Sequence, residues 1–518
     1  MPFLGKREIP ELGAAPEPAE QYVTRTYKLR LVTPMFGGGA EAGKIDPERP
    51  IRASSIRGHL RWWWRLLHQK SYVENGVLDA AAMRSREFEI WGSTDSPSPV
   101  QIKVKTISAL QKRFKGDPND RPFKPFQFGR FDPESYALFS AIENKDLGQD
   151  AAIVKEGFEF ELSLHWPTDA RLKELRQIEN SVRKRKQEPE LADSILDITS
   201  DIERTISAWI AWGGIGARTR RGLGSLDVLA ASKPLPDAAV PDGCDVYYGQ
   251  STTEGSMKAW ANAVEVYQLF RQSFRGRKRR KPRIGAPVPG RSHWPEPDSI
   301  RKITGCQLTP SASQPALGCP ADEDFQDHST PVVSQTIPHF PRAVLGLPIG
   351  FHFADGPGKR KPAVPSQDPA GVELKPRARD MSGTELVDDQ GRPSSGDRMA
   401  SPIITKAVKL KNAWRSAVLV LPHQLALKMS CVLEGENALW VPAPHAARPN
   451  QGNAIQLKQP VSSAQIVSAI PFSLCPTTMT DPLRGSRNAI EALTRFLVNP
   501  TDGFNQSKTV FSLWRGQS

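Results

Sequence analysis

Cysteine and long apolar runs are scarce in this chain of 518 residues. The five cysteines are odd in number and widely spaced, which favours reduced thiols over a framework of disulfide bonds. No apolar run approaches the roughly 20 residues needed to span a bilayer, and the first residues lack the apolar core of a signal peptide. We therefore expect a cytoplasmic protein that has no membrane partner.

Complete catalytic signatures are also missing. Residues 38–45, GGAEAGKI, nearly match the phosphate-binding P-loop, but Ile45 stands where a hydroxyl must bind Mg²⁺, and Pro47 interrupts the helix that should follow. The cysteines and histidines between residues 306 and 339 lack the closely spaced pairs that are typical of zinc ligands. No paired carboxylates or hydrolase motifs stand out. We therefore expect no nucleotide hydrolysis, no metal and no cofactor.

Positive charge, by contrast, is in excess, since the formal net charge is +13 at pH 7. Such an excess favours a polyanionic partner, with nucleic acid ahead of an anionic membrane surface. The segment RGRKRRKPR, residues 275–283, has seven basic residues and no acidic one. Within it we assign Arg277, Arg279 and Arg280 to RNA contact.

A segment rich in tryptophan and arginine, IRASSIRGHLRWWWRLLHQ, covers residues 51–69. On a helix with Ser54 or Ser55 as its N-cap, one apolar stripe and one cationic stripe form. The apolar stripe consists of Ile56, Leu60, Trp63 and Leu67. The cationic stripe consists of Arg57, Arg61, Arg65 and His68. We expect Trp64 to lie between the two stripes, with its N–H toward water.

The cationic stripe has no acidic counterpart nearby in the sequence. No Asp or Glu lies between Ile51 and Tyr72, although a surface helix usually carries both signs of charge. We therefore predict that this helix binds an anion, in preference to the simpler interpretation as a solvated amphipathic helix. The residues assigned to RNA contact here are Arg52, Ser55, Arg57, Arg61 and Arg65.

Two glycine-rich loops accompany this helix, and the first, FGGG at residues 36–39, precedes it. The second, GGIGARTRRGLG at residues 213–224, follows a helix and precedes a strand, which is the reverse of the order in a dinucleotide-binding fingerprint. Its glycines permit positive φ and close approach to backbone amides, and its arginines are bidentate phosphate donors. A plain structural turn would not call for three arginines. We therefore assign to RNA contact Gly37 and Gly38 of the first loop, and Gly214, Gly216, Arg218, Arg220 and Arg221 of the second.

The apolar periodicity predicts an α+β fold. Besides the helix at 51–69 and another at 192–212, strands are expected at residues 26–34, 87–93, 100–107, 157–167 and 225–230. This order indicates one antiparallel sheet with two helices on one face, which is a ferredoxin-like arrangement.

We expect four parts along the chain: a flexible tail at residues 1–20, a ferredoxin-like domain at 21–232, a proline-rich linker at 233–255 and a second domain at 256–518. The second domain is predicted to contain a helix at 256–276, a strand at 343–353, a hairpin at 401–422 and a late helix at 482–498. Residues 354–400 have hardly any apolar periodicity, so we interpret them as a long mobile insertion.

Several of these segments together resemble the RAMP superfamily of CRISPR-associated proteins, and within it the first-numbered RAMP subunit of Cmr (type III-B) effector complexes. The resemblance is carried by LVTPMFGGG, PIRASSIRGHLRWWWRLL, FEIWGS, GGIGARTRRGLGSL, PGRSHWPEPDSIR, FPRAVLGLPIGFHF and RMASPIITKAV, which lie between Leu31 and Val408. The glycine-rich loop before a strand is typical of RAMP proteins generally. The pair PIRASSIRG and GRSHWPEPDSIR is more specific to this subunit.

The resemblance implies two ferredoxin-like (RRM-like) domains with a glycine-rich loop and long insertions. It also implies contact with guide RNA (crRNA) and target RNA near the 3′ end of the guide, and a position that caps a filament of other Cmr subunits in antiviral defence. Because a different, repeated subunit cuts the target in that family, the resemblance implies a non-catalytic role.

Two other functions stay open at this point. A metal-independent endoribonuclease that processes guide RNA would use His59 or His352 as its general base, although a packed or surface histidine is the simpler interpretation of each. A protein-only scaffold would use the basic surface to bind acidic partner proteins.

Overall fold

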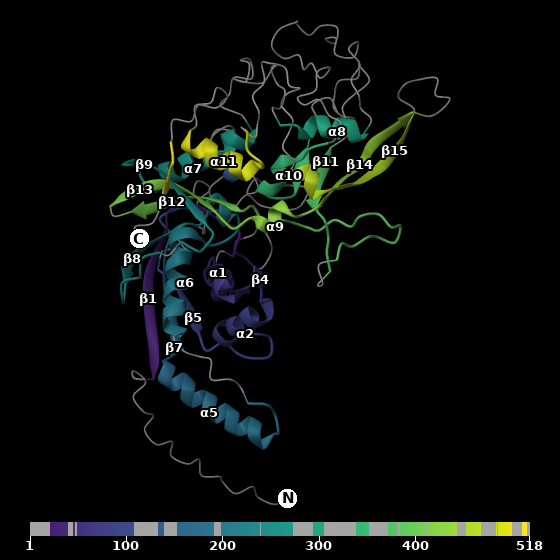
Figure 1. Ribbon diagram of the computed structural model, residues 1–518. Helices are drawn as coiled ribbons and strands as arrows, with labels where there is room; N and C mark the ends of the chain where they lie inside the picture. Colours follow the sequence, from purple (N-terminus) through teal and green to yellow (C-terminus); the bar gives the residue numbers. More distant parts are fainter. Residues whose placement is uncertain are drawn as a thin grey trace, which may run out of the picture. The chain divides into compact units, whose positions relative to one another are not determined.

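A computed structural model of the chain has two compact units, and Figure 1 shows their helices and strands. The first unit comprises Met1–Phe123, Glu143–Ala217 and Gly224–Asp242, and the second comprises Lys124–Ile142, Arg218–Leu223 and Gly243–Ser518. The described residues are 21–39, 45–46, 49–107, 133–138, 153–190, 198–238, 240–272, 294–304, 338–351, 371–380, 384–410, 412–442, 452–467, 483, 485–499 and 510–514. The predicted tail at 1–20 and the basic segment with Arg277, Arg279 and Arg280 lie outside them.

The first unit is built on an antiparallel sheet of four strands. These are β1 (Tyr22–Leu31), β5 (Gln101–Thr106), β7 (Glu159–Pro167) and β8 (Leu226–Ala231), in the order β5-β7-β1-β8. Alternate apolar residues of β1 and β7 are buried, as the period of two in their sequences predicts. The strand predictions at 26–34, 100–107, 157–167 and 225–230 are therefore confirmed.

Among the described residues of the first unit, four helices exceed ten residues: α1 (Ala53–His68), α2 (Ala80–Trp91), α5 (Asp169–Arg185) and α6 (Ile198–Trp212). This unit also contains two short pairs of antiparallel strands. In one, β2 (Met35–Phe36) pairs with β6 (Ile153–Val154), and in the other, β3 (Val73–Glu74) pairs with β4 (Val77–Leu78). Helices α1 and α6 pack against each other, and Figure 1 shows α6 running alongside β1. The helix predicted at 192–212 is confirmed from Ile198 to Trp212, and residues 192–197 lie outside the described residues.

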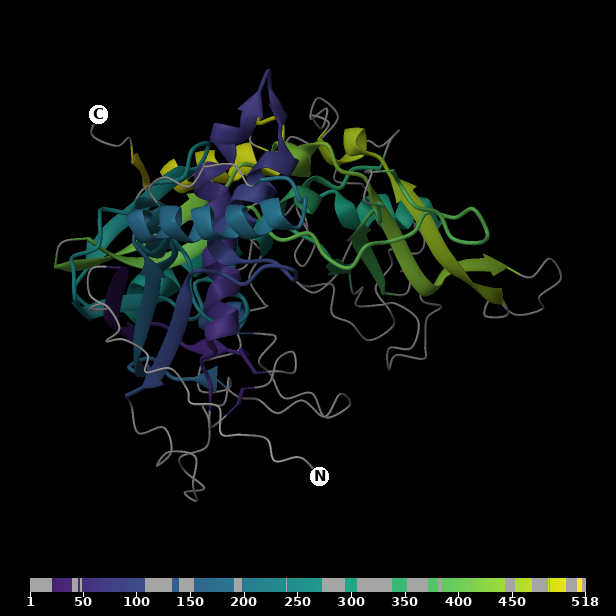
Figure 2. The ribbon, with the colours of Figure 1, turned by 90° about the horizontal axis from the view of Figure 1, so that it is seen from below.

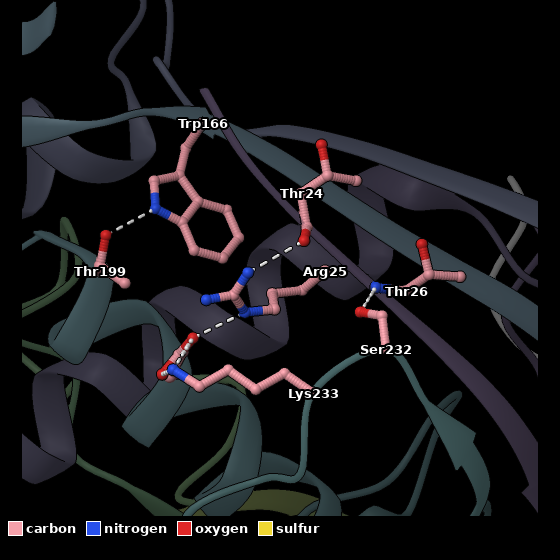
Figure 3. Close-up of polar contacts among 8 residues, drawn as sticks. Thr24, Arg25, Thr26, Trp166, Thr199, Ser232 and Lys233 are labelled. Carbon is pink, nitrogen blue, oxygen red and sulfur yellow. Dashed lines mark hydrogen bonds and ion pairs between the residues drawn. The ribbon is translucent and has the colours of Figure 1, made fainter. Parts of the chain in front are cut away.

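A polar cluster ties the start of α6 to the sheet (Figure 3). The guanidinium of Arg25 donates from Nε to Glu203 Oε1 at 2.7 Å, and Lys233 Nζ lies 3.2 Å from the other oxygen of the same carboxylate. The Arg25 guanidinium also lies 5.9 Å from the ring centre of Trp166, whose Nε1 donates to Thr199 Oγ1 at 3.0 Å. These contacts join β1, β7 and the segment after β8 to the first two turns of α6.

Residues 87–93 are not the predicted strand, because Glu87–Trp91 form the end of α2. The side chain of Asp79 accepts hydrogen bonds from two first-turn amides and so starts this helix. The buried residues Glu87, Ile90 and Trp91 follow helical spacing. Four alternating residues were too short a pattern to separate a strand from the last turn of an amphipathic helix. The sequence also gave no prediction for α5.

The second unit contains a sheet with the same connectivity. Its strands are β9 (Asp245–Thr252), β12 (Ile403–Leu410), β13 (Ala413–Val420) and β16 (Ser512–Trp514), in the antiparallel order β12-β13-β9-β16. Helix α7 (Ser256–Gln272) follows β9, and α11 (Ala489–Val498) lies between β13 and β16 in sequence. In both units the succession strand, helix, two strands, helix, strand thus builds a sheet in the order second, third, first, fourth.

A further sheet of the second unit consists of β10 (Ile349–Phe351), β11 (Val372–Pro376), β14 (Cys431–Pro442) and β15 (Gly452–Val461), in the order β10-β11-β14-β15. The short helices described in the second unit are α4 (Pro133–Ala137), α8 (Glu296–Thr304), α9 (Gln424–Leu427) and α10 (Ser463–Val467). One apolar core runs from α7 and α11 to both sheets of this unit. The predicted hairpin at 401–422 is confirmed by β12 and β13, and the predicted helix at 256–276 is confirmed by α7 over its described part. The late helix predicted at 482–498 begins only at Ala489, where the side chain of Asn488 caps it.

Three predictions for the second half need correction. The linker at 233–255 contains β9, so the connecting segment is shorter than its proline content suggested. The strand at 343–353 begins instead with a 3₁₀ turn, Pro341–Leu345, and only Ile349–Phe351 is extended. The insertion at 354–400 is not mobile throughout, because β11 buries Val372 and Leu374 against its neighbours.

The coarse prediction of an α+β protein with antiparallel sheets is confirmed. Among the residues that the structure describes, no helix is both long and apolar enough to cross a membrane.

Candidate nucleic-acid interface

Helix α1 begins without a side-chain cap. Its N-cap residue is Arg52, not Ser54 or Ser55 as predicted, and the Arg52 side chain makes no capping hydrogen bond. The backbone stays extended through Arg52, so both serines fall inside the first turn. This turn contains no acidic residue. Its amide N–H groups, at the positive end of the helix dipole, therefore have neither a capping oxygen nor a carboxylate in their own turn.

The two glycine-rich loops meet beside this helix start. Gly38 has a φ of +107° and Gly216 a φ of +83°. A Cβ atom built on Gly38 would lie 3.2 Å from the carbonyl oxygen of Pro50 and 4.0 Å from Gly216 Cα. A Cβ on Gly216 would lie 2.5 Å from the carbonyl oxygen of Phe36. Only glycine fits this close approach of three backbone segments.

Arg52 fastens the first loop to the helix. Its Nε donates to the carbonyl oxygen of Gly38 at 3.0 Å, and one terminal nitrogen donates to that of Gly39 at 2.6 Å. We call this assembly the glycine junction; it consists of Gly37, Gly38, Gly216, Arg52 and the first turn of α1. It brings together three of the assigned glycines with Arg52 and Ser55.

The rest of the second loop is mostly bonded to its own chain. Gly214 accepts a hydrogen bond from Trp209 Nε1 at 3.2 Å. The amides of Ile215 and Ala217 donate to the carbonyls of Gly224 and Phe36 at 2.9 and 2.7 Å. These bonds make the loop a structural turn as well as one side of the glycine junction.

The arginine stripe of α1 faces α2 rather than an open surface. Arg61 Nε lies 2.6 Å from one oxygen of Glu87, and Arg65 Nε lies 3.6 Å from the other. Arg57 donates to the carbonyl oxygen of Val100 at 2.8 Å, and burial, followed by the positive charge of Arg61, lowers its pKa. The counter-charge missing from the sequence around the stripe is therefore supplied by the next helix. Arg65 is the most exposed of the three, with 46% of its side chain accessible.

Both Trp63 and Trp64 are core residues. Trp63 was predicted so, and it is 2% exposed. Trp64 was expected at the edge of the core, but it is fully buried and its Nε1 donates to Asp201 Oδ2 at 3.4 Å. The N–H is satisfied by α6 and not by water.

The loop arginines belong to the second unit and bind carbonyl groups of that same unit. Arg218 donates to the carbonyl of Ala137 at 2.7 Å, and Arg220 donates to that of Ser401. Burial, and then the positive charge of Arg221, lowers the pKa of Arg218 and of Arg220 to about 10. Arg218 and Arg220 stay charged at pH 7 but have a packing role, which the sequence assignment to RNA did not anticipate.

Arg221 is held by an aromatic ring. Its guanidinium lies 4.4 Å from the ring centre of Tyr267 and donates to that hydroxyl at 3.2 Å. Gly222 permits this turn, because a Cβ there would lie 2.6 Å from the carbonyl oxygen of Thr405. The stretch from Arg218 to Gly222 therefore packs on β12 and α7.

Of the two histidines of the nuclease hypothesis, the structure describes His59 but not His352. Burial lowers the pKa of His59, so its imidazole is neutral at pH 7. His352 lies outside the described residues. Within the described part of the chain, no group of three or more His, Cys, Asp or Glu residues could bind a metal ion.

Comparison with known proteins identifies similar sequences over this region. The family model of the RAMP superfamily matches residues 28–227, which include α1 and the glycine junction. A similar protein is "CRISPR system Cmr subunit Cmr1-1" of Pyrococcus furiosus, 27% identical over 215 residues, which are 41% of this chain and 47% of the relative. "Cmr subunit Cmr1-2" of the same organism is 33% identical over 78 residues, which are 15% of this chain and 37% of the relative. The chain thus spans less than half of the length of these curated relatives.

Two solved structures are similar at low identity. The apo crystal structure of Cmr1 from Pyrococcus furiosus aligns with 14% identity and a TM-score of 0.38, over 77% of this chain and 88% of that one. A chain of the type III-B Cmr-beta complex bound to cognate target RNA aligns with 17% identity and a TM-score of 0.28, over 41% of this chain and 55% of that one.

Proposed function

We propose that the chain, whose residues 28–227 match the family model of the RAMP superfamily, is a non-catalytic RNA-binding subunit of a type III-B CRISPR Cmr complex. In this proposal it contacts guide and target RNA near the 3′ end of the guide and caps the filament of other Cmr subunits. The names of the two similar Pyrococcus proteins, both Cmr subunits, support the assignment to this complex.

We also propose that each unit is a ferredoxin-like half. The shared strand order, second, third, first, fourth, supports this interpretation, because a strand, helix, strand, strand, helix, strand succession with antiparallel neighbours is the ferredoxin-like connectivity. The sheet of β10, β11, β14 and β15 is then an insertion into the second half.

The observation that carries the RNA-binding proposal is the glycine junction. A helix start with neither a side-chain cap nor a first-turn acid, next to glycines that admit close backbone approach, suits one phosphate group of an RNA backbone. Such a contact carries no information about the base. This suits a complex that carries a guide RNA, because base pairing supplies the sequence specificity.

Ser55→Glu tests the glycine junction. A carboxylate in the first turn of α1 interacts favourably with the helix dipole, so the free energy of unfolding should stay equal or rise by about 0.3–1 kcal/mol. The same charge repels a phosphate, so RNA affinity should fall at least about tenfold, and the log–log salt slope should shrink by about 0.7. Measurement is by titration of the full chain with labelled guide-length RNA at several salt concentrations.

Ala82→Glu is the matched control. It puts the same charge into the first turn of α2, whose N-terminal amides already bond to Asp79, and Ala82 is exposed. It should change RNA affinity by less than about twofold. Equal effects of the two variants would mean that only net charge matters, and the glycine junction would then have no special role.

The two other functions need their own experiments. Incubation of the purified chain with repeat RNA, with and without EDTA, tests for a metal-independent nuclease, and cleavage that His59→Ala abolishes would establish it. A protein-only scaffold would retain no RNA at any salt concentration. Purification together with a discrete small RNA and several other subunits is the result expected here.

A further inference from the structure

Helix α5 is the least buried long helix of the first unit. Among its seventeen described residues, Leu172 alone is buried. Leu175, Ile178 and Val182 are 37%, 53% and 43% exposed. Figure 1 shows the helix beyond the end of β7, and Figure 2, seen from below, has it in front of the strands of this unit. Three large aliphatic side chains on one helix face are costly to leave in water.

The three exposed aliphatic side chains and two arginines follow a heptad pattern, and of these arginines Arg185 is exposed while the side chain of Arg171 is 23% accessible. Arg171, Leu175, Ile178, Val182 and Arg185 are separated by 4, 3, 4 and 3 residues. This alternation averages 3.5 residues and places all five on one seam of the helix, as in helices that pair with another helix. The buried Leu172 lies off this seam, on the same side of the helix as Arg176, which pairs with Glu89 of α2 at 3.7 Å. One face of α5 thus anchors the helix, and a neighbouring face is left for a partner.

The charges at the two ends of the seam decide which partner fits. In a parallel pair of two copies, Arg171 would meet Arg171, and Arg185 would meet Arg185. In an antiparallel pair centred on Ile178, Arg171 would meet Arg185. Both arrangements place like charges together, which disfavours a second copy of this chain. Arg171 already forms an ion pair with Glu174 at 2.7 Å, whereas Arg185 is exposed. An acidic residue of a partner should therefore interact more strongly with Arg185 than with Arg171.

We propose that the seam of α5 is a docking surface for an amphipathic helix of a different protein chain, with aliphatic residues at its centre and Asp or Glu opposite Arg185 and Arg171. A protein helix fits better than RNA, because the centre of the seam is three aliphatic side chains and no cation. An RNA backbone offers no apolar surface to cover them. The docking surface is independent of the RNA contact at the glycine junction.

The test uses the full chain and two synthetic helical peptides of about three heptads each. Both carry Leu at the central seam positions; one carries Glu and the other Lys where the partner would meet Arg171 and Arg185. Fluorescence anisotropy should show saturable binding of the Glu peptide, at least about tenfold tighter than the Lys peptide. Arg185→Glu should reverse or abolish that preference. Leu175→Ser combined with Ile178→Ser should weaken the Glu peptide by at least about tenfold.

Gln177→Ser is the matched control, since Gln177 is exposed on the same helix but off the seam. It should leave binding unchanged, and the double serine variant should keep the melting temperature and the RNA affinity of the wild type. Three results would overturn the proposal: no preference between the peptides, a large fall in melting temperature for the double variant, which would mean that the seam packs within its own chain, or a loss confined to RNA affinity. A stable homodimer through α5 would also contradict it.

Discussion

Helices α1 and α5 have similar lengths and many arginines, yet they are stabilised in different ways. Helix α1 has no side-chain cap, but it buries six of its residues, and its Arg61 and Arg65 pair with the carboxylate of Glu87 in α2. Helix α5 has a Thr168 cap, a first-turn Asp169 and three basic residues in its last turn, but buries one residue. Tertiary packing therefore forms α1, whereas local signals form α5.

The comparison shows what a cationic stripe in a sequence can and cannot indicate. The stripe of α1 was predicted to bind an anion because it has no nearby acid, and the structure supplies one from α2. The basic residues of α5 attracted no prediction, and its informative residues are the aliphatic ones between them. Exposure, which decides what a charged helix can bind, depends on the neighbouring element and not on the helix sequence.

The largest expected difference between the helices is in the cost of truncation. Trp64→Ala removes a fully buried ring together with its hydrogen bond to Asp201, so the free energy of unfolding should fall by about 3–5 kcal/mol. Leu175→Ala on the exposed seam of α5 should change it by less than about 0.5 kcal/mol. Thermal melts followed by far-UV circular dichroism measure both. Similar losses would mean that the α5 seam is buried against its own chain.

Breaking an ion pair should also cost more stability on α1 than on α5, but this difference should be smaller than the difference between the truncations. The side chain of Glu87 is only 4% exposed, and Glu87→Gln keeps its size but removes the counter-charge of Arg61 and Arg65. The free energy of unfolding should therefore fall by about 1–3 kcal/mol. Glu174→Gln breaks the pair with Arg171 on α5, where the glutamate side chain is 54% exposed. That loss should stay below about 1 kcal/mol and disappear at high salt. Urea denaturation at two salt concentrations gives both values, and equal costs would remove the distinction between the helices.

The sequence was sufficient where a pattern is local and long. The alternation in β1 and β7, the apolar stripe of α1 and the hairpin β12-β13 were all predicted, because each repeats over several residues within one element. It failed for residues 87–93, where the alternation covers only four side chains, and for β9, which lies in a proline-rich stretch read as a linker.

The sequence predicted individual residues of the glycine junction but not their contact with one another. Gly38, Gly216 and Arg52 were assigned to one function, but no sequence rule brings residues so far apart in the chain into contact. The uncapped start of α1 was missed because Ser54 and Ser55 resemble caps, and the role of Glu87 was missed because its partner Arg61 lies 26 residues away. The assignment of the junction and of the loop arginines to RNA stays a prediction.

The smallest expected effect concerns the first turns of the two helices. Thr168 accepts a hydrogen bond from the Arg171 amide at 3.3 Å, so Thr168→Ala should destabilise the first turn of α5 by about 1 kcal/mol. Because few buried contacts oppose local opening of α5, the effect should appear as roughly fivefold faster amide hydrogen exchange within that helix, with little change in the global melting temperature. Ser55→Ala in the first turn of α1 removes no cap, and its amide exchange should stay within about twofold of the wild type. If Ser55→Ala opened α1 as much as Thr168→Ala opens α5, then Ser55 would cap α1 in solution, and the first-turn amides would not be available to a phosphate.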